Sequence, residues 1–201
     1  MYSPPYNRVE ERAEVVAFMR ANNFPALVTA TGALRASHLP VVVEEREAQI
    51  VIDMHMARVN PQWRDFSGPE VLVIFSGPHA YISPRWYEET ERVPTWNYAA
   101  VHAYGVPTVV SDPGVKHASQ RRLIASLDAE WLPRFDALDA GYVERMLGAI
   151  VVFEIPVTRL ETRWKLSQNR GRREMELIAE ALEKGGETAL AALTRKHMAR
   201  D

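Results

Sequence analysis

Four short segments of this chain combine hydrogen-bonding side chains with large aromatic rings. A hydrophobic core has no use for that mixture, because a buried polar group costs free energy unless it finds a partner. A binding site for a flat, polar ligand needs both kinds of side chain. The mixture therefore predicts a site for a nucleotide-like cofactor. The segments are residues 55–63 (H-M-A-R-V-N-P-Q-W), 77–87 (G-P-H-A-Y-I-S-P-R-W-Y), 93–98 (V-P-T-W-N-Y) and 165–170 (K-L-S-Q-N-R).

The first group of candidate residues lies where a strand predicted over residues 49–54 ends. His55 and Arg58 follow that strand, and the segment Ser37-His38-Leu39-Pro40 belongs to the strand that we expect to pair with it. An arginine beside the backbone N–H groups of a helix entry suits a phosphate group. An ordinary surface arginine in a loop explains the same residues without any ligand.

The second group is Thr95-Trp96-Asn97-Tyr98. The asparagine offers donors and an acceptor, and the two rings offer stacking faces, which suits a heteroaromatic ring with imide edges. Taken alone, the segment is better explained as an aromatic strand in a core, with Asn97 as a turn residue.

The elements that must position these residues are mostly strands, connected by short turns. Short connections favour antiparallel pairing and a barrel over a doubly wound sheet. We therefore predict a mainly β fold with peripheral helices, of the α+β class. Strands are predicted over residues 26–30, 34–44, 49–54, 71–76, 79–83, 95–110 and 149–166, with a turn at Gly77-Pro78 and a break near Pro156; helices are predicted over 8–22, 113–130, 139–147, 172–184 and 188–199.

Composition narrows the class of protein. A length of 201 residues with 47% hydrophobic residues fits one domain with a sizeable core. A net charge of −2 argues against a globally basic nucleic-acid binder, and the absence of cysteine excludes disulfides and thiolate chemistry within the chain. The sequence shows no signal peptide and no apolar stretch long enough to cross a bilayer, so we expect a soluble cytoplasmic protein without membrane contact.

The histidine spacing, the absence of known catalytic motifs and a basic run bear on other classes of function. The six histidines lack the i, i+4 spacing of a helical metal site, so we predict no metal. Walker A, G-x-G-x-x-G and G-x-S-x-G motifs are missing, which argues against P-loop, Rossmann and serine hydrolase proteins. A basic run can contact phosphates or form a solvated face; it consists of Arg163, Lys165, Arg170, Arg172 and Arg173.

The four segments, together with S-H-L-P at residues 37–40, resemble in order and spacing the PaiB-type family of FMN-binding negative transcriptional regulators. The resemblance runs from the N-terminus to Arg170. It implies an FMN-binding split β-barrel related to pyridoxamine-phosphate oxidase over residues 1–170, with residues 171–201 as a helical extension packed on it. It also implies a homodimer with FMN near the subunit interface.

The resemblance further implies which residues bind FMN. The phosphate would lie at the strand–helix turn, the ring along the hairpin strand, and the partner subunit would contribute the 95–98 segment. The implied set is Ser37, His38, Leu39, Pro40, His55, Met56, Ala57, Arg58, Asn60, Gln62, Thr95, Trp96, Asn97 and Tyr98.

Three functional hypotheses follow. The first is a transcriptional regulator whose DNA affinity responds to flavin. The helices predicted over residues 172–184 and 188–199, with Arg195, Lys196 and Arg200, are its candidates for DNA contact, although docking of these helices on the barrel explains them equally well. The second is a flavin-dependent oxidoreductase for a small molecule, in which His38, His79 and Tyr81 are the candidate proton donors. The third is a split barrel that holds haem instead of flavin.

Overall fold

The computed structural model describes residues 1–68, 70–88 and 91–198. The chain forms two compact units. Unit 1 comprises Met1–Val15, Ser76–Val101 and Glu161–Asp201, and unit 2 comprises Val16–Phe75 and His102–Leu160. Strands β5, β6 and β8 contribute residues to both units.

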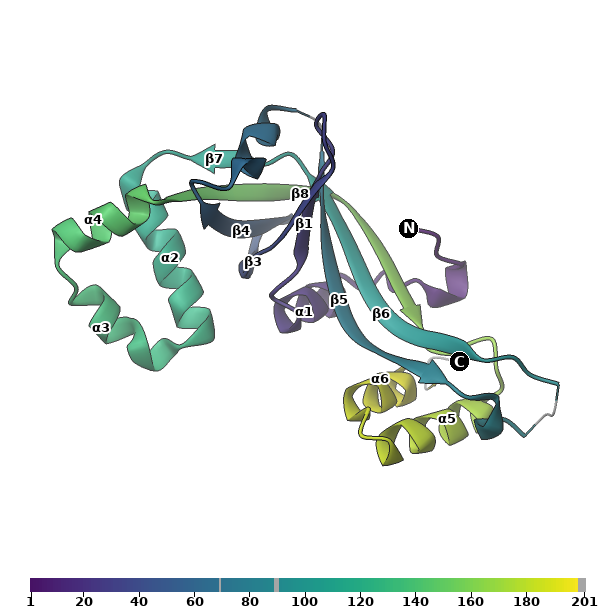
Figure 1. Ribbon diagram of the computed structural model, residues 1–201. Coiled ribbons are helices and arrows are strands. Elements are labelled where there is room, and N and C mark those ends of the chain that lie inside the picture. The colour runs from purple at the N-terminus through teal and green to yellow at the C-terminus, as the bar shows by residue number, and fades with distance from the viewer. Residues whose placement is uncertain (69, 89–90, 199–201) are drawn as a thin grey trace. The chain divides into compact units, whose positions relative to one another are not determined.

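The strands pair antiparallel wherever a register is defined. Their order is β2-β1-β5-β6-β8-β4-β3, and β7 pairs with β8 (Figure 1). This confirms the mainly antiparallel fold expected from the short connections. The strands are β1 (Ala26–Thr29), β2 (Arg35–His38), β3 (Val41–Arg46), β4 (Gln49–Ala57), β5 (Val71–Ile82), β6 (Thr95–Gly105), β7 (Thr108–Val110) and β8 (Ile150–Lys165).

The predicted helices are present, but α1 begins at Arg12 and not at residue 8, and α2 ends at Leu127 and not at residue 130. Asp112 caps α2 by accepting a hydrogen bond from the N–H of Val115, as expected for Asp before Pro113. The α-helices are α1 (Arg12–Ala21), α2 (Pro113–Leu127), α3 (Leu132–Asp136), α4 (Ala140–Gly148), α5 (Arg172–Lys184) and α6 (Thr188–Met198); the 3-10 helices are η1 (Pro5–Asn7), η2 (Pro61–Ser67), η3 (Pro84–Trp86) and η4 (Ala129–Trp131). The short helix α3 was not predicted, and Ala199 and Arg200 lie outside the described residues.

The prediction of one strand over residues 34–44 was wrong. The segment forms two strands, β2 and β3, separated by Leu39-Pro40. Strand β2 pairs with β1, whereas β3 pairs with β4. Proline lacks a backbone N–H and restricts the residue before it, so Pro40 is a natural point for the chain to leave one strand pair and enter another.

Two predicted interruptions were also wrong, because prolines are tolerated where ladder hydrogen bonds end. Strand β5 continues through Gly77-Pro78, beyond the residues 72–74 that pair with β1. Strand β8 continues through Pro156, which is opposite Val51 at the last position of the β4–β8 register.

Burial alternates along most of β6, although Ala100 is buried like its two neighbours. Asn97, Ala99, Val101 and Ala103 are buried, whereas Trp96 is 54% exposed. Pro107 lies between β6 and β7, so the strand predicted over residues 95–110 is divided there. Alternating side chains therefore fix which face of this strand reaches the core.

In unit 1, α5 and α6 lie side by side and bury apolar side chains such as Ile178, Leu182 and Leu190 (Figure 1). Strand β8 is tied to the N-terminal segment by Thr162, whose hydroxyl accepts from the N–H of Val9 at 3.0 Å and donates to its carbonyl at 2.9 Å. Among the described residues, no helix is long and apolar enough to cross a membrane.

In unit 2, β6 and β8 approach closely at Gly105. A Cβ atom built there would lie 2.3 Å from the carbonyl oxygen of Pro156 and 2.7 Å from Cγ2 of Ile155. Backbone cannot yield at such distances without moving a strand. Glycine is therefore required at this position for steric reasons.

We expect Gly105→Ala to lower the free energy of unfolding by about 1–3 kcal/mol, the usual cost of overpacking. Chemical denaturation measures the change. Gly148→Ala is the matched control, since its Cβ would meet nothing within 4 Å at the end of α4 and should leave stability unchanged or slightly raised. Equal stability of the two variants would contradict the close approach.

Candidate functional site

A buried amide joins three segments of unit 2. Gln62, only 1% exposed, donates from Nε2 to the carbonyl oxygens of Leu27 (3.1 Å) and Arg35 (3.3 Å). Its Oε1 accepts from the hydroxyl of Ser37 at 2.6 Å. The hairpin β1–β2 and the helix η2 are thus held together through one side chain.

Asn60 extends this arrangement to the turn that precedes η2. Its Oδ1 accepts from the backbone N–H of Gln62 at 3.0 Å and caps the helix. Its Nδ2 donates to Oγ of Ser37 at 3.0 Å. Ser37, Asn60 and Gln62 belong to the predicted set, and the structure brings them into direct contact although Ser37 lies 23 positions before Asn60.

A carboxylate that the sequence did not single out completes the network. Asp65 accepts from the hydroxyl of Thr29 at 3.0 Å and from Nη1 of Arg35 at 3.3 Å. The sequence signal that could have identified Asp65 is its position three residues after Gln62, on the same short helix. We refer to Ser37, Asn60 and Gln62 with Thr29 and Asp65 as the hairpin network.

Arg58 lies at the end of β4 with an exposed side chain. Its Nε donates to the carbonyl of Gly148 at 2.7 Å, and its Nη2 donates to that of Ile150 at 2.9 Å. Its backbone N–H donates to the carbonyl of Ala149 at 2.9 Å. Because these acceptors are neutral, they fix the guanidinium in place without compensating its positive charge. That arrangement suits an anionic ligand.

His55 lies within β4 and not beyond its end, because the strand runs three residues further than predicted. Its Nδ1 is 3.3 Å from the amide nitrogen of Gln120 on α2. Burial lowers the pKa of the imidazole from its usual 6.5, and the charge of Asp53 opposes that shift. At neutral pH His55 is therefore a neutral hydrogen-bonding group, and it does not add positive charge for a phosphate.

Helix α2 is anchored on β4 by a buried carboxylate. Asp53, 2% exposed, accepts from the hydroxyl of Ser119 at 2.7 Å and from Nη2 of Arg122 at 2.6 Å. Together with the contact between Gln120 and His55, these bonds hold α2 next to the strand that carries the candidate residues.

The remaining predicted residues of unit 2 have different environments. The ring of His38 stacks on that of Phe24 with centroids 5.9 Å apart. The N–H of Leu39 donates to the carbonyl of Pro25, and Pro40 follows it at the end of β2. Met56 is buried in the core, whereas Ala57 is exposed.

In unit 1, the segment Thr95–Tyr98 divides into buried and exposed residues. Asn97 is fully buried, and its side chain exchanges hydrogen bonds with the hydroxyl of Ser167 at 3.0 and 3.2 Å. Asn97 is therefore a strand residue, as the strand predicted over residues 95–110 requires, and not the turn residue of the alternative explanation. Thr95 accepts from the ammonium of Lys165, and the guanidinium of Arg163 lies 5.5 Å from the ring of Tyr98.

Ser167 is a residue that sequence reasoning placed in a motif but not in the site. Its φ of 67° is in the left-handed region, which costs a non-glycine residue about 1–2 kcal/mol. The buried pair with Asn97 holds it there. Its hydroxyl is consequently fixed at the end of β8.

Trp96 borders a pocket of about 480 Å³ in unit 1. His79 and Tyr81 lie on the same wall, with their ring centroids 6.2 and 6.4 Å from that of Trp96. Trp86 also lines the pocket. This is an aromatic pocket with two groups that can exchange protons. The described residues contain no cluster of three side chains suited to a metal ion.

Residues 1–159 match the family model described as "Putative FMN-binding domain". The chain is also 38% identical to Protease synthase and sporulation protein PAI 2 of Bacillus subtilis, over 91% of this chain and 89% of that protein. The chain belongs to the PaiB-type family of FMN-binding proteins. A more distant relative, an uncharacterized protein of Emericella nidulans, is 28% identical over 78% of each chain.

Solved structures establish the fold. The FAD and heme binding protein of Mycobacterium smegmatis superposes with a TM-score of 0.61 at 12% identity, covering 83% of this chain and 78% of that one. The flavocytochrome Anf3 of Azotobacter vinelandii gives 0.60 at 15% identity, covering 80% and 74%. The chain therefore has the predicted split β-barrel fold.

FMN is the cofactor of this family, and the residues at the end of β4 fit it. The observation that decides the fit is Arg58, whose guanidinium donates to the neutral carbonyls of Gly148 and Ile150, so that these contacts do not compensate its positive charge. FMN carries an anionic phosphate, which such an arginine can bind, and when bound it supplies a ring that exchanges electrons.

We expect Gln62→Leu to lower the free energy of unfolding by about 1–3 kcal/mol, because buried carbonyls and a hydroxyl lose their partner. Thermal or chemical denaturation measures this. Gln49→Leu, at an exposed position of β4, is the control and should change stability by less than about 0.5 kcal/mol. A Gln62 variant as stable as the control would show that the hairpin network does not hold η2 in place.

Proposed function

We propose that this protein is an FMN-binding regulator of transcription that acts as a homodimer. The observation that carries the proposal is its 38% identity, over 91% of the chain, to a protein whose name refers to protease synthesis and sporulation. That name refers to cellular programmes and to no substrate.

In this proposal Arg58 binds the FMN phosphate directly. Asn60 and Gln62 position the turn, and Ser37 joins them through its hydroxyl. The backbone around Ala57 and the segment His38-Leu39-Pro40 border the ring, while His55 accepts or donates a hydrogen bond as a neutral group. Met56 supports the turn from the core.

The partner subunit is proposed to complete the site with residues 95–98. The exposed ring of Trp96 is the group best suited to contact a ligand, since Asn97 is engaged with Ser167. Thr95 and Tyr98 would then border the ring through their hydroxyls. The boundary between barrel and helical extension at residue 170 is part of the same proposal.

Two cations of the C-terminal helix α6 are already paired with carboxylates. Arg195 pairs with Glu176 and Glu183 at 3.2 and 2.8 Å. Lys196 pairs with Glu14 at 3.0 Å. Carboxylates thus neutralise the cations that a recognition helix would offer to DNA phosphates. Contact with DNA would have to use another surface, such as the one around the exposed Arg172.

A second candidate function is a flavin-dependent oxidoreductase. The pocket beside Trp96 favours it, because 480 Å³ can hold a small molecule next to His79 and Tyr81. His38, stacked on Phe24, is a further group able to transfer a proton.

Absorption spectra of the protein, after incubation with FMN and desalting, test the cofactor and distinguish flavin from haem. The retained flavin spectrum is expected. Selection of genomic DNA fragments by flavin-loaded and flavin-free protein then tests regulation, with oxidation of reduced nicotinamide as the parallel assay. Enrichment of defined fragments in one flavin state supports the regulator. Turnover without enrichment would replace it with the oxidoreductase.

We expect Arg58→Ala to weaken FMN binding by about tenfold or more, since a hydrogen bond to a charged group contributes about 1.5–3 kcal/mol. Flavin fluorescence titration measures this affinity. Arg172→Ala removes an equally exposed arginine at the start of α5 and should bind FMN as the native chain does. An unchanged affinity in Arg58→Ala, with its fold intact by circular dichroism, would remove Arg58 from the site.

A further inference from the structure

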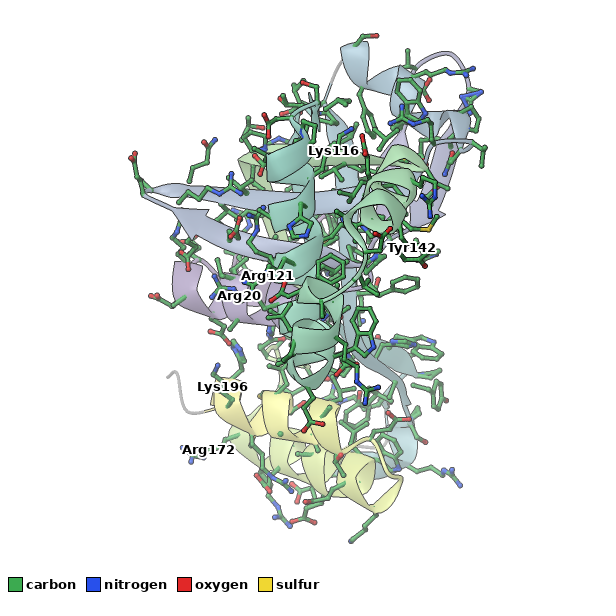
Figure 2. All side chains as sticks on the ribbon, turned by 90° about the vertical axis from the view of Figure 1, so that its left-hand side faces the viewer. Arg20, Lys116, Arg121, Tyr142, Arg172 and Lys196 are labelled. Atoms are coloured by element: carbon green, nitrogen blue, oxygen red, sulfur yellow. The ribbon has the colours of Figure 1, made fainter. Side chains whose placement is uncertain are left out.

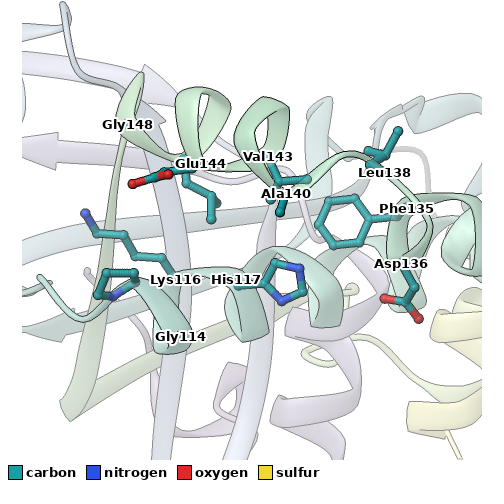
Figure 3. A pocket seen from close by; sticks show the side chains of 12 residues that line it. Gly114, Lys116, His117, Phe135, Asp136, Leu138, Ala140, Val143, Glu144 and Gly148 are labelled. Atoms are coloured by element: carbon teal, nitrogen blue, oxygen red, sulfur yellow. The ribbon is translucent and has the colours of Figure 1, made fainter.

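Helices α2, α3 and α4 enclose a second pocket that lies wholly within unit 2 (Figure 3). Its volume is about 580 Å³, within the usual range for a small-molecule site. Apolar side chains form most of its wall: Phe135, Leu138, Val143 and Leu147. None of these residues belongs to the cofactor site described above.

One end of this pocket carries two opposite charges. The ammonium of Lys116 and the carboxylate of Glu144 both line that end (Figure 3). Neither group forms a salt bridge within the part of the chain that the structure describes. A ligand with one negative and one positive group can therefore neutralise both at once.

The other end is aromatic and carries no uncompensated charge. The ring of His117 stacks on that of Phe135 with centroids 5.2 Å apart and an angle of 26°. The carboxylate of Asp136 is held by two hydrogen bonds of 2.8 Å from Arg121. This end therefore suits a flat, apolar group.

We propose that the pocket binds a small zwitterion of the α-amino acid class with an apolar, preferably aromatic, side chain. The carboxylate of the ligand pairs with Lys116 and its ammonium with Glu144. The side chain lies along Val143 and Leu147 toward the ring of Phe135.

The walls of the pocket connect to the cofactor residues. Gly148 lines the pocket at the end of α4, and its carbonyl accepts the hydrogen bond from Nε of Arg58. On the opposite wall, α2 contacts His55 through Gln120 and Asp53 through Ser119. A ligand that bridges α2 and α4 therefore fixes the carbonyls that orient Arg58. This coupling rests on the proposed role of Arg58 in FMN binding.

Calorimetric titration of the flavin-free chain tests the ligand class. The probes are L-phenylalanine, 3-phenylpropionate, which lacks the ammonium, and 2-phenylethylamine, which lacks the carboxylate. We expect L-phenylalanine to bind at least tenfold more tightly than either analogue. Equal binding of the three probes, or no binding of any, would overturn the proposal. If a second copy of the chain fills the pocket instead, no probe binds and the protein is a dimer. Tyr142 lies on the exposed face of α4 (Figure 2), so Tyr142→Glu would then dissociate that dimer.

Charge reversal supplies the matched variants. Lys116→Glu and Glu144→Lys should each weaken L-phenylalanine binding at least tenfold, and the double variant should restore it, because the zwitterion can bind with its head reversed. Lys184→Glu, an exposed reversal on α5, is the control and should bind normally. A double variant as weak as the single ones, with normal circular dichroism, would overturn the pairing.

The coupling has its own measurement. Saturating L-phenylalanine should tighten FMN binding about fivefold or more, and FMN should tighten L-phenylalanine binding by the same factor, since coupling is reciprocal. An unchanged or weaker FMN affinity would overturn the coupling. Absence of any FMN binding would instead refute the proposed function, while the titrations on flavin-free protein would still decide the pocket.

Discussion

The amide of Gln62 must satisfy partners on both sides of the β1–β2 hairpin from one buried position. A buried polar group without partners costs about 1–3 kcal/mol, so these hydrogen bonds favour one mutual arrangement of the hairpin, η2 and the turn between β4 and η2. The hydroxyl of Ser37 and the cap formed by Asn60 are consequences of that requirement. The turn that follows the exposed Arg58 is therefore held by the hydrogen bonds of Asn60.

Arg58 shows how the fold keeps a positive charge available. A carboxylate partner would fix the side chain equally well but would neutralise it. The carbonyls of Gly148 and Ile150 fix it and leave its charge uncompensated. The cations of the C-terminal helices follow the opposite pattern, since glutamates bind Arg195 and Lys196. The contrast is between a cation held by neutral carbonyls and cations paired with carboxylates.

The sequence predicted most elements, because alternation along β6 and the cap of α2 at Asp112 are local signals. The prediction failed at prolines, because their effect depends on the partner strand. Pro40 lies between two strands, whereas Pro78 and Pro156 lie within strands. Pro78 is beyond the residues that pair with β1, and Pro156 is at the end of the β4–β8 register. The family resemblance placed Ser37, Asn60 and Gln62 in one predicted set, but their mutual contact depends on the tertiary fold. The roles of Asp65 and Ser167 could not be predicted, since only the folded chain gives each its buried partner.

The segment between β7 and β8 shows how helices beside a barrel can influence its site. Helix α2 is bound to β4 through the buried Asp53, and α4 ends at the carbonyls that hold Arg58. The two helices otherwise bury little, and Ser119 is the buried residue of α2. A molecule placed between them adds interactions where the protein has few, and its effect reaches β4 through bonds that already exist.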